Sequence, residues 1–387
     1  MKTNFKKLLY SGVTLMSIGV LAACSSTSSS TTTSSSAATS QSSAATTSSD
    51  STSSDSNSSS SSIDWSALPT TEVTLSNDGL KITEGGTYIL TGSTTAGVTV
   101  ETDANVRIIL AGAEISSSDT AAINVISADN VELELQDGTT NTVKDTSNHT
   151  DTNIEGAIHV EADLTITGNG NLTVEGNFQD GIVSTDDLII DAGSITVTAV
   201  DDGIRGKDSL TINGGTITVT AGGDGIKSTN DTDTTKGYTT ITGGEITVKA
   251  GDDGIKAETA LTIDGGTITV PESVEALEGT NITINGGTLD VYGSDDAINA
   301  ASTTSSDIFI KVIGGDLKVA VGSGDTDAFD ANGDIYISGG TIDVTAPTSA
   351  FDFDGTAELT GGTVTVNGEQ ITEITASGPG AGGHGGW

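Results

Sequence analysis

A repeat of about 22 residues constrains the fold of this chain more than any other feature of its sequence. A short motif recurs from QDGIVS at 179 to TDAFDA at 326, and its small third residue stands at positions 181, 203, 225, 254, 276, 297 and 328. The steps between these positions are 22, 22, 29, 22, 21 and 31 residues, and the two long steps contain polar insertions near 230–236 and 301–307. Such a period indicates stacked units, each of which buries its apolar face only against its neighbours.

Each repeat contains three short β runs, of the forms Gly-Ile-x-Ala, Leu-Thr-Ile and Thr-Ile-Thr-Val, as in DDGIRGKDSLTINGGTITV at 201–219. Alternation places Ile, Leu and Val on one face and Thr on the other. Asn-Gly-Gly or Asp-Gly-Gly between the second and third runs tolerates positive φ and so allows a sharp corner. We therefore predict an all-β fold, a right-handed parallel β-helix with three short strands per coil, whose coils stack roughly 4.8 Å apart.

The alternative is a β-sandwich of hairpins, because Asn-Gly also favours two-residue turns. Hairpins would not keep the same core positions at a fixed period through so many units, so we favour the β-helix. We expect residues 160–377 to form its regular part. Residues 63–159 contain clear strands with a looser period, and we expect them to form an N-terminal capping part that protects an exposed edge.

The N-terminal segment predicts export. Residues 1–23 combine three early Lys, an apolar stretch and Leu-Ala-Ala before Cys24, which is typical of a lipoprotein signal peptide whose cysteine becomes lipidated. An uncleaved anchor or a free thiol is the alternative. Residues 24–62 are mainly Ser and Thr and predict a disordered stalk, and 378–387 form a Gly-rich tail. We expect a protein anchored to the cell membrane through Cys24, on its extracellular face.

The charge of the chain excludes one class of partner. Fourteen basic and 53 acidic residues give a formal net charge of −39, which repels nucleic acid. Only 3% of the residues are aromatic, so recognition of sugars by ring stacking is less favoured than recognition by charge. The three histidines form no cluster in the sequence, and we expect them to be solvated rather than ligands or bases.

Stacking turns one position of the repeat into a row of carboxylates, which we call the acidic column. It precedes the small residue of each motif and comprises Asp180, Asp202, Asp224, Asp253, Glu275, Asp296 and Asp327. Adjacent carboxylates at the coil spacing repel one another, and Ca²⁺ would neutralise them, because it accepts irregular sets of carboxylate oxygens. The candidate ligands, which include neighbouring aspartates, are Asp180, Asp201, Asp202, Asp224, Asp252, Asp253, Asp295 and Asp296. The alternative is ordinary turn chemistry, in which Asp before Gly caps its own backbone.

A second outward position carries Arg205, Lys227 and Lys256 on consecutive repeats, and we call it the basic column. These residues either compensate the charge of the acidic column or contact an acidic polysaccharide. We treat all three as candidate carbohydrate-binding residues, with both interpretations open.

Several segments resemble one bacterial surface family. The signal cysteine, the Ser/Thr stalk, GGTYILTG at 85–92, VRIILAGAEI at 106–115, GNFQDGIVSTDDL at 176–188 and the Asp-Asp-Gly-Ile and Asn-Gly-Gly-Thr repeats are similar to those of carbohydrate-binding domain-containing proteins. This resemblance implies a right-handed parallel β-helix with bound Ca²⁺, similar in fold to pectate lyases, that binds plant-type polysaccharide. It implies Ca²⁺ on Asp201, Asp202, Asp224, Asp252 and Asp253. From Glu275 onward the motif changes to VEALEG, DDAINA and TDAFDA.

Three functions are consistent with these features. The first is a monomeric, surface-anchored protein that binds polysaccharide with Ca²⁺. The second is a polysaccharide lyase, in which Ca²⁺ neutralises a uronate carboxylate while Arg205, Lys227 or Lys256 removes the α proton. The third is an adhesin or structural spacer without a small ligand, for which a stiff rod on a stalk suffices.

Overall fold

A computed structural model describes residues 63–324 and 326–376 of this chain, and within them the structure is almost entirely β. It contains one short 3₁₀ helix, η1 (Trp65–Ala67), and 34 strands joined in one sheet. None of the described helical turns has the length and hydrophobicity needed to cross a bilayer. The predicted signal peptide, Cys24, the stalk at 24–62 and the tail at 378–387 lie outside the described residues.

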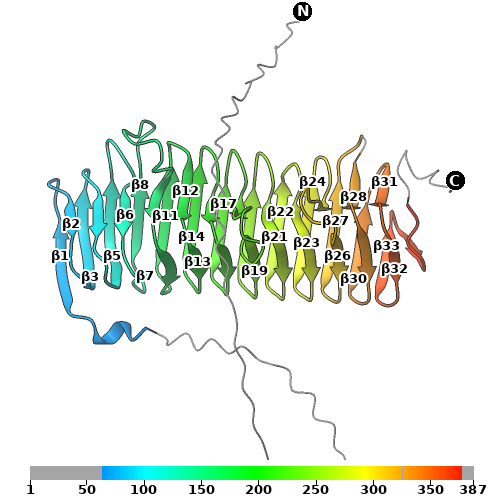
Figure 1. The fold of residues 1–387 in the computed structure, drawn as a ribbon, viewed down its shortest axis with the longest axis horizontal. Coiled ribbons are helices and arrows are strands. Elements are labelled where there is room, and N and C mark those ends of the chain that lie inside the picture. Colours follow the sequence, from blue (N-terminus) through cyan, green and yellow to red (C-terminus); the bar gives the residue numbers. More distant parts are fainter. Residues whose placement is uncertain (1–62, 325, 377–387) are drawn as a thin grey trace, which may run out of the picture. The chain divides into compact units, whose positions relative to one another are not determined.

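The strands form three columns that run along the stack of coils (Figure 1). The first column contains β2 (Leu80–Ile82), β4 (Val98–Glu101), β6 (Ile123–Ser127), β9 (Gly156–Val160), β12 (Asp180–Ser184), β15 (Ile204–Gly206), β18 (Ile226–Ser228), β25 (Ile298–Ala300), β28 (Asp327–Ala331) and β31 (Ser349–Phe353). The second contains β1 (Thr70–Leu75), β7 (Asn130–Leu135), β10 (Asp163–Thr167), β13 (Asp187–Ile190), β16 (Ser209–Ile212), β19 (Tyr238–Ile241), β26 (Phe309–Val312), β29 (Asp334–Ile337) and β32 (Ala357–Leu359).

The third column contains β8 (Thr140–Lys144), β11 (Asn171–Gly176), β14 (Ser194–Ala199), β17 (Thr216–Thr220), β20 (Glu245–Lys249), β22 (Thr267–Glu272), β24 (Thr288–Gly293), β27 (Asp316–Val321), β30 (Thr341–Thr345) and β33 (Thr363–Val366). Four long strands continue through a corner and belong to two columns each: β3 (Gly86–Thr94), β5 (Val106–Ser116), β21 (Ile255–Ile263) and β23 (Leu277–Ile284). After the last coil, β34 (Glu369–Ile371) pairs antiparallel with β33.

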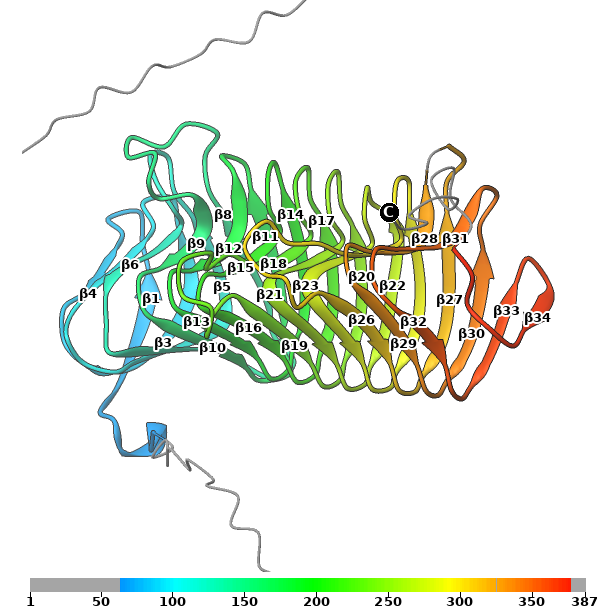
Figure 2. The same cartoon turned by 45° about the vertical axis from the view of Figure 1, so that its right-hand side comes forward.

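Apart from β34, each strand pairs in parallel with the strand one coil away, as β12 does with β15 and β15 with β18. The register repeats the sequence motif, since Ile182, Ile204 and Ile226 are consecutive partners. This pattern confirms the predicted parallel β-helix and excludes the β-sandwich alternative, because hairpins would give antiparallel pairs. Figure 2 shows the coils following one another along the stack.

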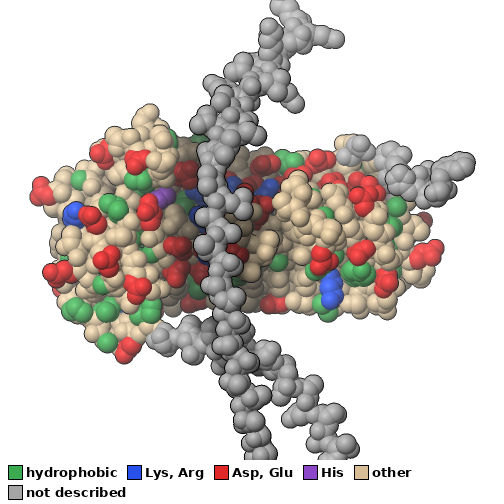
Figure 3. All heavy atoms as spheres, viewed as in Figure 1, with side chains coloured by type: hydrophobic (Ala, Val, Ile, Leu, Met, Phe, Trp, Pro, Cys, Tyr) green, Lys and Arg blue, Asp and Glu red, His purple; other side chains and the backbone are tan. Residues whose placement is uncertain are grey.

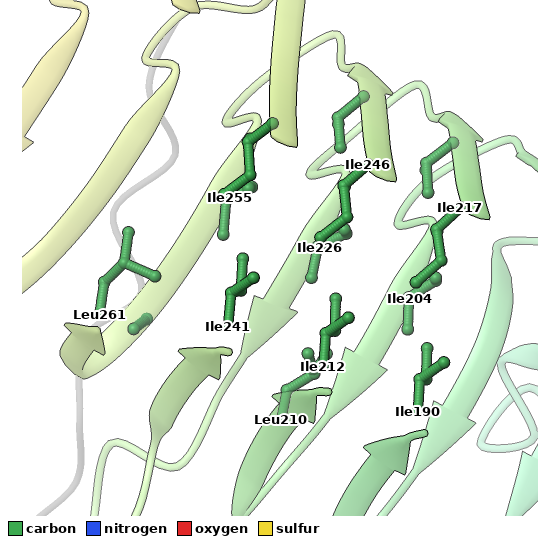
Figure 4. Packing of buried hydrophobic residues seen from close by; sticks show 14 of the residues in the cluster. Ile190, Ile204, Leu210, Ile212, Ile217, Ile226, Ile241, Ile246, Ile255 and Leu261 are labelled. Atoms are coloured by element: carbon green, nitrogen blue, oxygen red, sulfur yellow. The ribbon is translucent and has the colours of Figure 1, made fainter. Parts of the chain in front are cut away.

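The apolar residues of all three columns point into the stack. Ile204, Ile226 and Ile255 lie above one another from the first column, while Ile212 and Ile241 belong to the second (Figure 4). All five are fully buried. Burying such a side chain contributes about 1.5–3 kcal/mol relative to leaving it exposed, and the contribution recurs in every coil.

The corner between the second and third columns needs glycine. Gly215 has a φ of 94°, and Gly244, Gly266 and Gly287 repeat this conformation at the same corner of later coils. A side chain would be strained at such φ values, which explains why the second Gly of each Gly-Gly pair stands there. After this corner the chain forms the third-column strand, and the acidic column follows just before the first strand column, as Asp224 lies between β17 and β18.

Candidate functional site

The acidic column forms a continuous row along the first strand column, and the main chain holds it in place. The backbone N–H of Asp202 donates to Oδ1 of Asp180 at 3.1 Å, that of Asp224 donates to Asp202 at 2.9 Å, and that of Asp253 donates to Asp224 at 2.9 Å. All four carboxylates are buried. One oxygen of each of the first three is therefore fixed by the next coil, and its second oxygen remains for a cation.

The basic column supplies that cation in part of the stack. Nη2 of Arg205 lies 3.0 Å from Oδ2 of Asp180 and also pairs with Glu155. Nζ of Lys227 lies 2.5 Å from Oδ2 of Asp202 and 3.0 Å from Oδ2 of Asp224. Figure 3 shows basic side chains gathered near the middle of the stack with acidic side chains around them.

Lys256 continues the basic column by one coil. Its Nζ lies 2.6 Å from Oδ2 of Asp253 and 2.7 Å from Oε2 of Glu278. Burial alone would lower the pKa of Lys256, but its hydrogen bonds to Asp253 and Glu278 outweigh burial and raise the pKa above its usual value. The pKa of Lys227 is raised for the same reason by Asp224 and Asp202, against the effect of burial. All three basic residues thus act as internal counter-ions of the acidic column.

Compensation by basic side chains ends after Lys256. The register continues the same outward position with Glu278, Asn299 and Asp330. Burial, followed by the neighbouring carboxylate of Asp296, raises the pKa of Asp330 to about 7. Here the stack carries half-buried carboxylates with no lysine or arginine in the column to balance them.

Two groups of acidic residues meet beside the last two basic residues of the column, Lys227 and Lys256. Asp224, Asp252 and Asp253 form one, and Asp253, Glu275 and Glu278 form the other; in each, the oxygens lie within 4.8 Å of one another. Burial raises the pKa of Asp253 to about 6. Burial and contact with Asp253 raise that of Glu278 to about 7. Such a crowd of carboxylates holds a proton or a cation, because full ionisation without either is strongly unfavourable.

Asp253 belongs to both groups and has an unmatched oxygen. The residue is only 1% exposed, and in the described part of the chain no donor forms a hydrogen bond to its buried Oδ1. A buried, unpaired carboxylate oxygen costs free energy unless a ligand satisfies it. The donor set consists of carboxylates only, which suits a hard cation such as Ca²⁺.

The structure brings together some of the predicted ligands. Asp224, Asp252 and Asp253 converge, whereas within the described residues Asp180, Asp201, Asp202, Asp295 and Asp296 join neither group. Sequence reasoning did not predict Glu275 and Glu278 as ligands. The available signal was that Glu275 occupies the acidic column while Glu278 replaces the basic residue three positions later.

The prediction that the histidines are solvated is wrong for two of them. His159 is 3% exposed, and burial, followed by the charge of Arg205, lowers its pKa to about 4. His149 is also buried, stacks on Phe178 with ring centroids 4.4 Å apart, and places Nε2 2.9 Å from Oδ2 of Asp145. His149 lies in the segment between β8 and β9, and the irregular sequence of that segment did not indicate that the histidine is buried. His384 lies outside the described residues.

Comparisons with known proteins agree with this architecture. A family model described as carbohydrate-binding domain-containing protein matches residues 76–328. A carbohydrate-binding domain-containing protein of Acetivibrio thermocellus is 35% identical over 135 residues, which cover 33% of this chain and 47% of the relative. The match thus spans about half the length of that curated relative.

A solved structure is similar as well. It is described as the polysaccharide lyase-like protein from C. thermocellum, in a gadolinium derivative. It shares 33% sequence identity with a TM-score of 0.51, and the match covers 57% of this chain and 95% of that one.

Proposed function

The chain belongs to the family of carbohydrate-binding domain-containing proteins, and from that premise we propose that it binds acidic polysaccharide through Ca²⁺ held on the acidic column. Asp224, Asp252 and Asp253 would hold one ion, and Asp253, Glu275 and Glu278 offer a second set of ligands. The observation that carries the proposal is the buried, unpaired Oδ1 of Asp253 at the junction of the two groups.

The choice of cation follows from the ligands. Carboxylate oxygens in irregular numbers are typical of Ca²⁺ sites, whereas Zn²⁺ favours nitrogen and sulfur ligands. At either set an ion competes with a lysine ammonium, that of Lys227 at Asp224 or that of Lys256 at Asp253 and Glu278. The set with Asp252 is favoured because Asp252 is exposed, so a ligand can reach an ion bound there.

The ligand class follows from charge. A chain with a net charge of −39 repels a polyanion unless a bound cation lies between them. A Ca²⁺ ion accepts six to eight oxygen ligands, more than three side chains supply singly, so a uronate carboxylate can complete its coordination. The low aromatic content favours this mode over stacking of sugar rings.

The lyase alternative finds less support. A general base needs a pKa near the working pH, which for lysine means a lowered one. Carboxylates instead raise the pKa values of Lys227, Lys256 and Arg205 against the effect of burial. We therefore propose binding rather than cleavage, and assign the basic column to charge compensation in place of direct sugar contact.

The cellular setting stays part of the proposal. Lipidation of Cys24 would anchor the chain to the outer face of the cell membrane, and the Ser/Thr segment at 24–62 would hold the β-helix away from it. In that setting the protein retains polysaccharide at the cell surface.

The test is calorimetric titration of the full chain with oligogalacturonate, in Ca²⁺ and in chelator. We expect binding only with Ca²⁺, its loss in Asp253→Asn and its reduction in Asp252→Asn. Asp343→Asn, which changes an exposed acid on β30, is the matched control and should bind normally. Equal binding in chelator would refute the proposal, and new ultraviolet absorbance from unsaturated uronate products would favour the lyase.

A further inference from the structure

Two polar insertions stand at the same corner of the β-helix with two regular coils between them. The first links β18 to β19 and the second links β25 to β26, while β21 and β23 pass the same corner without interruption. The insertion-bearing coils are three coil steps apart, or roughly 14 Å at the usual spacing of paired strands. The insertions therefore form two walls over the floor that β21 and β23 provide.

Two adjoining hollows occupy this space, and together we call them the insertion groove. One has a volume of 280 Å³ and is lined by residues that include Lys256, Glu278, Ser302 and Asn332. The other has a volume of 140 Å³ and is lined by residues that include Asn230, Asp231, Thr234 and Ser305. Glu258 and Thr280 line both, so the two hollows share a boundary. No aromatic side chain lines either, but hydroxyl, amide and carboxylate groups are abundant.

Hydrogen bonds fix the shape of both walls. In the first, Oδ1 of Asn230 accepts from the backbone N–H groups of Thr232 and Asp233, and its Nδ2 donates to Asp208 at 2.6 Å. In the second, Oγ of Ser302 accepts from the backbone N–H groups of Thr304 and Ser305. A groove shaped before binding spends little free energy on ordering its walls when a ligand arrives.

The floor and the first wall each present an acceptor that is not engaged elsewhere. Asp231 and Glu258 are exposed, and the carboxylate of neither forms an ion pair or hydrogen bond with another residue in the described part of the chain. A carboxylate accepts hydrogen bonds from sugar hydroxyls, and charged acceptors give stronger bonds than neutral ones. No lysine or arginine lines the smaller hollow, so these two acids repel an anionic sugar there.

We propose that the insertion groove binds an uncharged, hydroxyl-rich sugar unit through Asp231 and Glu258. This inference rests on the proposed function and adds a second subsite to it. Glu278 belongs both to the acidic group with Asp253 and to the lining of the larger hollow, so the two subsites adjoin. A polysaccharide that contains both acidic and neutral units fits this arrangement, with the acidic unit at the cation and the neutral unit between the insertions.

The experiment titrates the full chain with neutral oligosaccharides of glucan, xylan, mannan and galactan, and separately with oligogalacturonate. We expect at least one neutral oligosaccharide to bind, in chelator as well as in Ca²⁺. Asp231→Ala combined with Glu258→Ala should weaken that binding at least about tenfold, because two charged hydrogen-bond acceptors are lost. Glu245→Ala removes an exposed acid from β20, outside the groove, and should leave it unchanged. Terbium luminescence should show unaltered cation binding in the double variant.

Two results would overturn the inference while leaving cation-dependent binding intact. One is undiminished binding of the neutral oligosaccharide by the double variant. The other is a wild-type chain that binds oligogalacturonate and none of the neutral oligosaccharides. Failure to bind either class of saccharide would instead remove the proposed function together with this subsite.

Discussion

Asp224 and Asp253 are 29 residues apart in the chain, yet the backbone N–H of Asp253 donates a 2.9 Å hydrogen bond to Oδ1 of Asp224. The same bond joins Asp202 to Asp180 and Asp224 to Asp202. The main chain thus holds buried carboxylates at the spacing of the coils, and each needs a positive partner on its free side. Arg205, Lys227 and Lys256 supply it from Asp180 to Asp253, whereas later coils carry Glu278, Asn299 and Asp330 at the same outward position.

Replacing Lys227 by methionine should destabilise the protein strongly. The ammonium group bridges Asp202 and Asp224, whose side chains are each 7% exposed, so its removal leaves two buried charges unpaired. Breaking a buried pair in this way costs about 3–5 kcal/mol. Denaturant unfolding of Lys227→Met against wild type measures the loss.

Lys318→Met is the control for that variant. Lys318 lies 3.8 Å from Asp290 with both side chains largely exposed, and such pairs contribute about 0–1 kcal/mol. Asp224→Asn added to Lys227→Met should recover part of the lost stability, since one unpaired charge is removed. Similar losses of stability in Lys227→Met and Lys318→Met would show that burial of the carboxylates does not determine how much these ion pairs stabilise the fold.

Replacing Gly225, the second glycine of the GDGIKS motif, by a residue with a side chain should destabilise the fold, because neighbouring coils are in close contact there. A Cβ added at Gly225 would lie 2.1 Å from Cγ1 of Val248, so Gly225→Ala forces the coil to shift. Overpacking of this kind costs about 1–3 kcal/mol. At Gly279 the nearest atom to an added Cβ is 3.4 Å away, so Gly279→Ala should be neutral. Thermal melting of the two variants compares them directly, and equal melting points would contradict the close packing at Gly225.

The fold could be predicted because every coil repeats the same pattern of apolar and polar residues and the same glycine corner. Alternating Ile and Thr determine which face is buried, and the Gly-Gly corner, with positive φ at Gly215, determines where the strand turns. The period then sets the register, which pairs Ile204 with Ile226 as the repeat implies. The prediction of fold and register does not depend on side-chain conformation, and for this reason it agrees with the structure.

The candidate site could be predicted only in part, because the length and conformation of the side chains determine which of them come into contact. The period places Asp224 and Asp253 in one row, but whether Lys227 bends back to them or faces a ligand depends on rotamers. Glu275 and Glu278 join Asp253 because their longer side chains reach across one coil. The burial of His159 also escaped prediction, since it depends on neighbouring segments that do not follow the repeat.

Removing Ca²⁺ should lower the melting temperature, by an amount that grows with the logarithm of the Ca²⁺ concentration relative to the dissociation constant. A ligand present at a hundred times its dissociation constant stabilises the folded state by about 2.7 kcal/mol. In a domain of this size we expect a rise of several degrees on adding Ca²⁺ to chelator-treated protein. Asp253→Asn should abolish the rise, whereas Asp343→Asn should retain it. An equal rise in Asp253→Asn would place the ion elsewhere.

His159 should make the protein lose stability as the pH falls. It is buried in the first strand column, where its partners on the two neighbouring coils are Asn124 and Val183. Burial, followed by the nearby charge of Arg205, lowers the pKa of His159 to about 4. Because the unfolded chain binds a proton at this residue near pH 6.5 while the folded chain resists it, the stabilisation is complete above that pH. It disappears as the pH falls to about 4, and amounts to ~3 kcal/mol.

The variant that isolates this effect is His159→Asn, which places at this position the residue that Asn124 provides on the preceding coil. The carboxylates with raised pKa values also titrate in this range, and they favour the folded state as the pH falls, so the wild-type curve alone mixes opposite contributions. Subtracting the stability of His159→Asn from that of wild type at each pH cancels the carboxylates and leaves the histidine. We expect this difference to decline between pH 6.5 and about 4, and a flat difference would mean that the folded protein accepts a proton on His159 as readily as the unfolded chain does.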